Sequence, residues 1–206
     1  MIPVQYEKLC PVCDGYLSTD EVERNVCSVK ELSLRTPFLI SAFEEFKKSF
    51  SERVKSDLRD IQAVWCRRIL KGESFCITAP TGTGKTLMGI FTAGFFSLNG
   101  KKSYLLVPST LLLRQVVERI KSIFPEVNVQ FYYGALPKNV REEALVSIEK
   151  GEFDVLVTTV QFLVKNFNVL KGKKFDFIFV DDVDAVLKNS RNVDKILKLV
   201  GFSDQE

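Results

Sequence analysis

At residues 79–86 the chain has the sequence Ala79-Pro80-Thr81-Gly82-Thr83-Gly84-Lys85-Thr86, between a short apolar run and a helical pattern. Glycines at this spacing let backbone N–H groups turn inward around phosphate oxygens, while the lysine reaches the β- and γ-phosphates and the next hydroxyl binds Mg²⁺. Such loops usually begin with Gly, whereas Ala79 stands here, so the segment is a variant of the pattern. The sequence therefore predicts a loop that binds ATP, with a glycine-rich turn of no function as the alternative. The predicted nucleotide contacts are Pro80, Thr81, Gly82, Thr83, Gly84, Lys85 and Thr86.

Short apolar runs alternate with helical patterns around this loop. The predicted buried strands are Ser74–Ala79, Ser103–Val107, Val129–Tyr133, Val155–Thr158 and Phe177–Val180. The predicted helices between them are Lys85–Leu98, Thr110–Phe124, Asn139–Lys150 and Val160–Asn166. Strict alternation of this kind indicates an α/β fold, in which a parallel sheet carries helices on both faces. Ligands bind such sheets at the carboxyl ends of the strands, so candidate site residues are sought there.

The region before the loop has a different organisation. Residues 1–34 contain a Cys-x-x-Cys pair and several charges without a sustained period, which favours a small appended Cys-containing module, and residues 35–206 then form the main domain. Aromatic and aliphatic residues recur at helical spacing over Thr36–Glu52 and Leu58–Leu70, so two amphipathic helices are expected. Core packing is the simplest role for their aromatic stripe, although one ring could face a nucleotide base.

Composition limits the classes of function. The 206 residues include 46% hydrophobic ones, and 29 Lys and Arg against 26 Asp and Glu give a net charge of +3, which permits nucleic-acid binding without requiring it. There is no histidine, so catalytic triads, imidazole bases and histidine metal ligands are excluded. No window approaches the roughly 20 apolar residues of a membrane span, and no signal-peptide pattern is found at the start. We expect a cytoplasmic protein with no membrane partner.

Two carboxylates follow the last predicted strand. Phe177–Val180 leads directly into Asp181 and Asp182. Magnesium on a nucleotide needs an anionic partner across from the phosphate loop. Asp181 is therefore predicted to hold Mg²⁺, usually through water, and Asp182 to orient or deprotonate the attacking water. Together with Lys85 they form the predicted catalytic set. The alternative is that the pair only begins a turn or caps the next helix.

Four segments in order resemble the motifs of superfamily-2 helicases: Ala79–Thr86 (motif I), Pro108–Leu111 (Ia), Thr158–Phe162 (Ib) and Asp181–Asp184 (II). The resemblance implies a RecA-like domain. It also implies that Ser109, Thr110, Thr159 and Gln161 contact a nucleic-acid backbone, with Arg114 as a charged helper. Ser109 and Thr110 could instead cap the helix that begins there, or do both. Upstream, Arg59–Gln62 resembles the Q motif, so Gln62 is the candidate for adenine selection, with a solvent-facing glutamine as the alternative.

The sequence Asp-Asp-Val-Asp-Ala at 181–185, the N-terminal Cys-Pro-x-Cys, Lys71–Pro80 and Asn192–Lys195 are similar to reverse gyrases. That family couples a two-lobed helicase-like ATPase to a type IA topoisomerase and introduces positive supercoils into DNA. The resemblance spans essentially the whole chain and implies a zinc-finger-like module plus the first lobe only. We therefore expect DNA as a partner. The chain could be a split subunit, a truncated gene product or an excised fragment, and a split subunit would have a separately encoded second lobe and topoisomerase part as its partner. We expect slow hydrolysis by this chain alone, because the second lobe supplies an arginine finger, which contributes roughly 10³ to 10⁵ in rate. A non-catalytic nucleic-acid-binding or regulatory module is the main alternative, and a P-loop kinase is disfavoured because motifs Ia and Ib have no role in one.

The cysteines leave the metal content open. Cys10 and Cys13 have the spacing of a zinc knuckle, and Cys27 is a candidate third thiolate. Structural zinc needs four ligands, and only carboxylates such as Asp14 or Asp20, water or a partner chain could supply the fourth. The family resemblance implies zinc, whereas the ligand count argues against it. Cys66 and Cys76 are expected to be buried as small hydrophobic residues.

Overall fold

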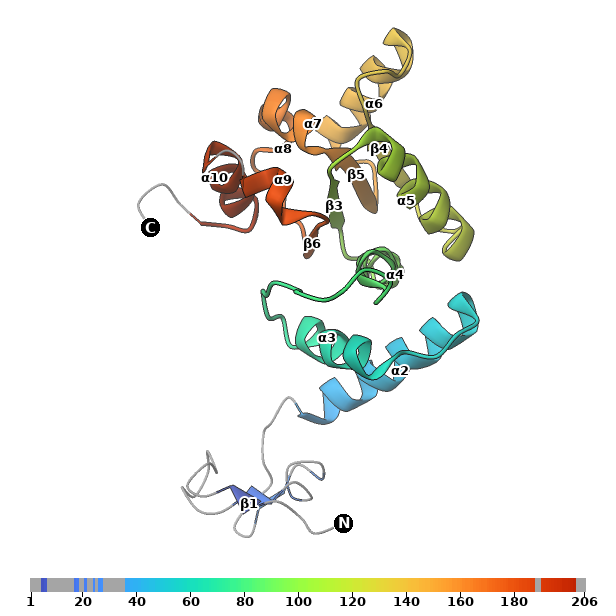
Figure 1. Ribbon diagram of the computed structural model, residues 1–206, viewed down its shortest axis with the longest axis vertical. Helices are drawn as coiled ribbons and strands as arrows, with labels where there is room; N and C mark the ends of the chain where they lie inside the picture. Colours follow the sequence, from blue (N-terminus) through green and yellow to red (C-terminus); the bar gives the residue numbers. More distant parts are fainter. Residues whose placement is uncertain are drawn as a thin grey trace. The chain divides into compact units, whose positions relative to one another are not determined.

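The computed structural model describes residues 5–6, 17–18, 21, 24, 26–27, 36–187 and 190–202. The chain divides into two compact units, Met1–Thr78 and Ala79–Glu206 (Figure 1). The boundary expected between residues 34 and 35 lies outside the described residues and stays a prediction.

In the first unit, α2 (Thr36–Val54) packs against α3 (Asp60–Leu70), and β1 (Gln5–Tyr6) pairs in antiparallel fashion with β2 (Leu17–Ser18). Both predicted helices are confirmed to within two residues at each end. Their shared interior is aromatic, as the sequence predicted, because the buried side chains are Phe43, Phe46, Phe50, Trp65 and Cys66. Burial raises the pKa of the Cys66 thiol to about 12. Cys76, by contrast, is exposed, so its predicted burial is wrong.

The second unit is built on a parallel sheet of four strands in the order β4-β5-β3-β6, which confirms the predicted α/β class. The strands are β3 (Ser103–Val107), β4 (Val129–Tyr132), β5 (Val155–Thr159) and β6 (Phe177–Val180). The helices are α4 (Lys85–Leu98), α5 (Thr110–Ile123), α6 (Lys138–Lys150), α7 (Val160–Lys165), α8 (Phe167–Leu170), α9 (Val183–Leu187) and α10 (Ser190–Leu199). Every residue of β3 and β5 is buried, because these two strands are central in the sheet and are covered on both faces.

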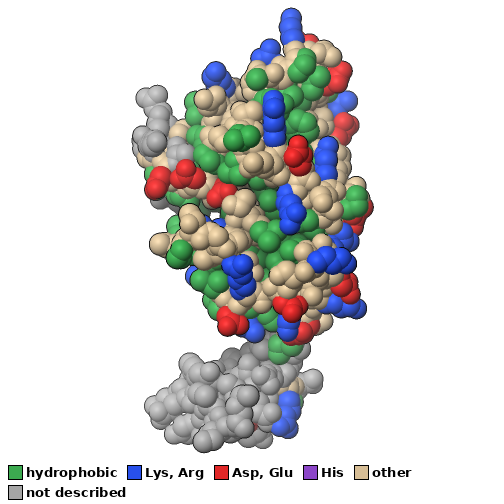
Figure 2. Space-filling view, turned by 45° about the vertical axis from the view of Figure 1, so that its right-hand side comes forward, with side chains coloured by type: hydrophobic (Ala, Val, Ile, Leu, Met, Phe, Trp, Pro, Cys, Tyr) green, Lys and Arg blue, Asp and Glu red, His purple; other side chains and the backbone are tan. Residues whose placement is uncertain are grey.

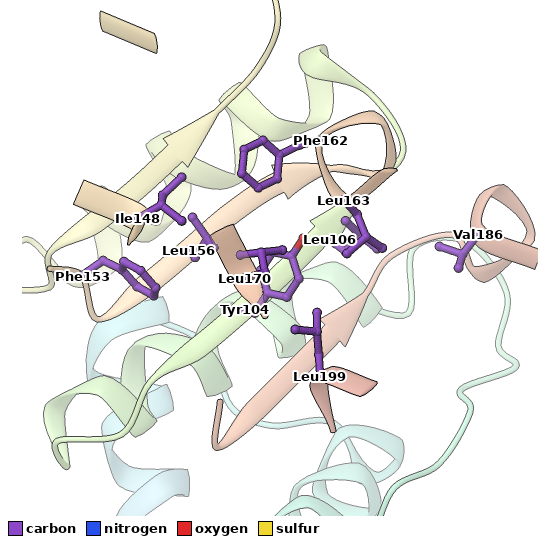
Figure 3. Close-up of a cluster of buried hydrophobic side chains, with 10 residues drawn as sticks. All are labelled: Tyr104, Leu106, Ile148, Phe153, Leu156, Phe162, Leu163, Leu170, Val186 and Leu199. Carbon is purple, nitrogen blue, oxygen red and sulfur yellow. The ribbon is translucent and has the colours of Figure 1, made fainter. Parts of the chain in front are cut away.

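Helices cover both faces of this sheet (Figure 1). On one face α4 packs against α5 and the sheet through aromatic rings, with Phe91 against Phe124, the residue after α5, and Phe96 against Phe177 of β6. On the other face, residues of β3 and β5 meet side chains from α6, α7, α8, α9 and α10 (Figure 3). The strand alternation explains this division, since Tyr104 and Leu106 point into the cluster of Figure 3 while Ser103 bonds to the Ala93 carbonyl of α4.

The segment Ser74–Ala79 is not a strand, so this part of the prediction is wrong. Its alternating pattern suits a strand, but strand preference is realised only when the backbone finds a ladder partner. Among the described residues no strand pairs with this segment, and contacts with α3 hold it instead. Phe75 lies under the Arg68 guanidinium of α3 at 4.2 Å, and Arg68 also pairs with Glu73 at 2.6 Å.

None of the helices among the described residues is both long enough and apolar enough to cross a membrane.

Candidate functional site

The loop before α4 wraps around its own lysine. Gly82 and Gly84 have φ angles of 80° and 86°, a region that glycine adopts without steric cost. The Lys85 ammonium donates to the carbonyl of Ala79 at 2.6 Å and to that of Pro80 at 3.0 Å. The Thr83 hydroxyl donates to the same Pro80 carbonyl at 2.9 Å. The lysine is therefore held inside the curve of the loop. A phosphate that binds the Lys85 ammonium must displace its hydrogen bonds to these two carbonyl oxygens.

The carboxylate predicted to hold Mg²⁺ lies against this loop. The Thr86 hydroxyl donates to Asp181 Oδ2 at 2.8 Å, although 95 positions separate the two residues in the sequence. Asp181 is positioned by β6, which it follows, and by its own backbone N–H, which donates to the Leu106 carbonyl at 2.9 Å. Two oxygens in adjacent positions around one Mg²⁺, each at about 2.1 Å, lie about 3.0 Å apart. The observed pair therefore fits the first coordination sphere of magnesium.

Asp182 takes a strained backbone conformation. Its φ is 60°, the left-handed region, which Asp tolerates better than most residues. It turns the chain from β6 into α9, and its side chain is exposed. This placement suits either a group that reaches an attacking water or a simple turn, so its catalytic role stays a prediction.

The other predicted contacts lie at the same edge of the sheet, which is the one formed by the carboxyl ends of the strands. Val107 and Thr159 are register partners at the ends of neighbouring strands, which brings Ser109 and Thr110 near Thr159 and Gln161. The Ser109 hydroxyl accepts from the Leu112 N–H at 3.2 Å, so the capping role is confirmed for Ser109. Thr110 is half-buried, Thr159 is buried and Gln161 is exposed.

A buried hydrogen bond braces the two central strands beneath this edge. The hydroxyls of Tyr104 and Thr158 lie 2.7 Å apart, and Tyr104 belongs to the cluster of Figure 3. Burial raises the pKa of Tyr104, so its hydroxyl stays protonated and can donate. The bond holds the strand that carries Thr159 in place, and the sequence offered no signal for it because the two residues are 54 positions apart.

Arg114 is exposed, and its side chain lies against an aromatic ring. Its guanidinium lies 5.0 Å from the ring centroid of Tyr133, the residue that follows β4. Sequence reasoning missed Tyr133 because it was assigned to a buried strand. It is a half-buried side chain just beyond the strand end.

Gln62 belongs to the first unit. Its side-chain oxygen accepts from the Arg59 N–H at 3.0 Å as part of a capping box at the start of α3. The residue is only 3% exposed, so the solvent-facing alternative is wrong. Its role in adenine selection stays a prediction.

The cysteine module falls mostly outside the described residues. Cys10 and Cys13 are not described, and the Cys27 side chain is half-buried. Among the described residues no group of three or more Cys, Asp or Glu side chains could hold a metal. Zinc binding therefore stays a prediction.

Comparison with known proteins shows which families the chain resembles. Residues 59–205 match the model of the DEAD/DEAH box helicase family. The whole chain is 38% identical to reverse gyrase 1 of Aquifex aeolicus, and 95% of it is 44% identical to reverse gyrase of Pyrococcus furiosus. It spans only 19% and 17% of the lengths of those two relatives.

Two solved structures share the fold. One is a hypothetical ATP-dependent RNA helicase from Sulfolobus tokodaii, with a TM-score of 0.57 and 23% identity over 74% of this chain and 45% of the other. The second is the Sulfolobus solfataricus SWI2/SNF2 ATPase core in complex with dsDNA, with a TM-score of 0.56 and 20% identity over 70% of this chain and 30% of the other. The phosphate loop, the carboxylate that meets it and the match over 147 residues (59 to 205) lead to one conclusion: the chain belongs to the DEAD/DEAH box helicase family.

Proposed function

We propose that this chain is the ATP-binding first lobe of the helicase-like motor of a reverse gyrase. The observation that carries the proposal is the 2.8 Å bond between Thr86 and Asp181, beside Lys85. It supports a Mg²⁺-ATP site in which Lys85 binds phosphate oxygens while Thr86 and Asp181 ligate the metal. Bound Mg²⁺ neutralises the charge of the triphosphate. Asp182 orients the attacking water, and Gln62 selects adenine.

The same sheet edge binds DNA in this proposal. Ser109, Thr110, Thr159 and Gln161 offer hydroxyls and an amide to phosphate oxygens, which position a strand without reading its bases. The SWI2/SNF2 core that shares this fold was solved in complex with dsDNA, which supports DNA as the partner.

The full activity needs parts beyond these residues. The relatives are named reverse gyrases, and the chain spans 14% to 19% of the lengths of three of them. A second motor lobe and a topoisomerase part are therefore proposed partners. A protein of these 206 residues alone binds ATP and DNA and hydrolyses ATP slowly, since no segment after Asp184 resembles a further motif. The zinc-finger module and the cytoplasmic location stay predictions.

Binding of a fluorescent ATP analogue with Mg²⁺ tests the proposal. Lys85→Ala should weaken binding about 10- to 100-fold, because a hydrogen bond to a charged group contributes about 1.5–3 kcal/mol. Lys174→Ala, which removes an exposed lysine elsewhere, is the matched control and should leave the affinity unchanged. Equal affinities for all three proteins would refute the assigned site. Turnover measured with single-stranded DNA, with and without an added second lobe, separates a motor lobe from a non-catalytic module.

A further inference from the structure

One side of the second unit carries two paired aromatic and cationic side chains. The Arg114 guanidinium lies 5.0 Å from the Tyr133 ring centroid, and the Lys121 ammonium lies 5.7 Å from that of Phe131. The two rings stack on each other, with centroids 6.2 Å apart and planes 13° from parallel. We call Arg114, Lys121, Phe131 and Tyr133 the aromatic–cation strip.

Secondary structure places these four side chains in line. Residues two apart in an extended segment share a face, so Phe131 and Tyr133 project together, and residues seven apart share a helix face, so Arg114 and Lys121 project together from α5. Tyr132, between the two rings, turns to the opposite face and packs on Phe162 at 4.7 Å. β4 is the edge strand of the sheet, so the strip lies at the margin of the unit.

The strip is not part of the core. Its rings are half-buried and its two cations are exposed, whereas α5 turns Leu113, Val116, Val117 and Ile120 into the interior. Figure 2, which brings forward the right-hand side of Figure 1, shows Lys and Arg side chains interspersed with hydrophobic ones. Surfaces of this kind bind single-stranded nucleic acid, because every base has a π-face that can stack on a ring or a guanidinium plane.

The strip is continuous with the edge that is proposed to bind DNA. Tyr132 is the register partner of Thr158, so the next residue, Tyr133, lies at the level of Thr159. Arg114 lies one helical turn from Thr110. From there Phe131 and Lys121 lead away from the edge, along β4 and α5.

We propose that the aromatic–cation strip is a stacking site for unpaired bases, which extends the DNA-binding edge and gives it a preference for single-stranded DNA. This inference rests on the proposed DNA binding and goes beyond it, because Ser109, Thr110, Thr159 and Gln161 contact only the backbone and do not distinguish a strand with bases from one without. Bases inside a duplex are already stacked on each other, so the strip does not bind them. The Glu118 carboxylate is exposed on α5 between the two cations, which leaves stacking rather than charge as the main source of affinity.

The test compares two single strands of about 12 nucleotides, a length within the range that one binding module covers. One is oligo-dT and the other is an abasic strand with the same backbone. The 206-residue chain should bind oligo-dT about 5- to 100-fold more tightly than the abasic strand, as expected for one or two stacked bases. Tyr133→Leu should remove most of that difference. Equal binding of both strands by the unchanged protein would overturn the proposal.

A second variant separates stacking from a structural role of the ring. Tyr133→Trp keeps an aromatic plane and adds a reporter, so it should retain the preference for oligo-dT and lose fluorescence when oligo-dT binds but not when the abasic strand binds. Unchanged fluorescence with oligo-dT at saturation would also overturn the proposal. Tyr133→Leu and Tyr133→Trp are compared in urea unfolding, so that any loss of stability is seen directly.

A third comparison tests the path of the strand. Glu118→Gln removes the carboxylate between the cations and should tighten oligo-dT binding a few-fold, whereas Glu143→Gln, an exposed position on α6, should not.

The same measurements distinguish failure of the aromatic–cation strip from failure of the DNA-binding edge. If both strands bind equally and Gln161→Ala weakens both, the DNA-binding edge stands and the strip is wrong. If neither strand binds, both proposals are wrong.

Discussion

Two helices of the second unit cover the same face of the sheet and begin at the same edge, yet they begin in different ways. The first turn of any α-helix has N–H groups without a partner inside the helix. At α5 the Ser109 hydroxyl accepts one of them, from Leu112. At α4 the capping residue is Gly84, in the left-handed conformation, and no side chain caps the helix.

We interpret this difference as one between a structural helix start and the proposed nucleotide site. A serine cap uses local donors for stability and leaves fewer for anything else. A glycine cap has no side chain that could occupy the space of a phosphate, and the positive end of the helix dipole then favours an anion. We therefore expect triphosphate at α4 and only a peripheral backbone contact at α5. Three pairs of variants test this comparison, in order of decreasing effect.

The largest effect is expected where α4 touches the sheet. A Cβ atom at Gly89 would lie 2.5 Å from the Phe179 ring, and one at Gly94 would overlap the Phe124 ring. Gly89→Ala and Gly94→Ala should each lower the free energy of unfolding by about 1–3 kcal/mol, as overpacking does. Only Gly89→Ala should also weaken ATP binding, because Phe179 lies two residues before Asp181. Urea unfolding and nucleotide titration check both effects. Equal loss of ATP affinity in the two variants would show that stability, not the Thr86–Asp181 pair, controls binding.

A smaller effect is expected at the two ends of α4. Gly84 and Gly100 both have left-handed backbones, with φ of 86° and 71°. Alanine in that region costs about 1–2 kcal/mol, so Gly84→Ala and Gly100→Ala should destabilise the unit to a similar degree. Gly84→Ala should in addition weaken binding of the ATP analogue, since it alters the helix start that is assigned to phosphate. If Gly100→Ala weakens binding as much, the assigned difference between the two ends of α4 is contradicted.

The smallest effect is expected at the start of α5. Ser109→Ala should lower the free energy of unfolding by about 1 kcal/mol through loss of the cap. Ser109→Asp keeps a good cap and should preserve stability, but it should weaken DNA binding about fivefold, since two unit charges about 4 Å apart in water repel by about 1 kcal/mol. DNA titrations at low salt and thermal unfolding measure the two quantities. Unchanged DNA affinity in Ser109→Asp would remove Ser109 from the backbone contacts.

Local pattern predicted much of the second unit. Four strands and the helices between them were placed to within one residue at most ends, because buried parallel strands and amphipathic helices differ in period and length. The helices α8, α9 and α10 were not predicted. Segments of four or five residues, such as α8 and α9, hold too little periodicity to be recognised, and such short helices are stabilised chiefly by tertiary packing.

The candidate site was likewise predicted in part from the sequence. The glycines, Lys85, Thr86 and the carboxylates after β6 were predicted as a site from spacing alone, because phosphate chemistry demands those residue types in that order. The engagement of the Gln62 side chain in a cap and the ring beneath Arg114 were not found. Each depends on which atoms lie nearby in space, and a linear pattern does not contain that information.

By itself the sequence predicted most of the strands and helices of the second unit and the residues proposed to bind a triphosphate, since both predictions follow from the covalent nature and local spacing of side chains. Only the tertiary structure decided that Thr86 and Asp181 meet at 2.8 Å and that Ser74–Ala79 stays unpaired. The physical reason is that hydrogen bonds between distant segments form only where packing of the sheet and its helices brings a donor to an acceptor, and packing is a property of the whole unit.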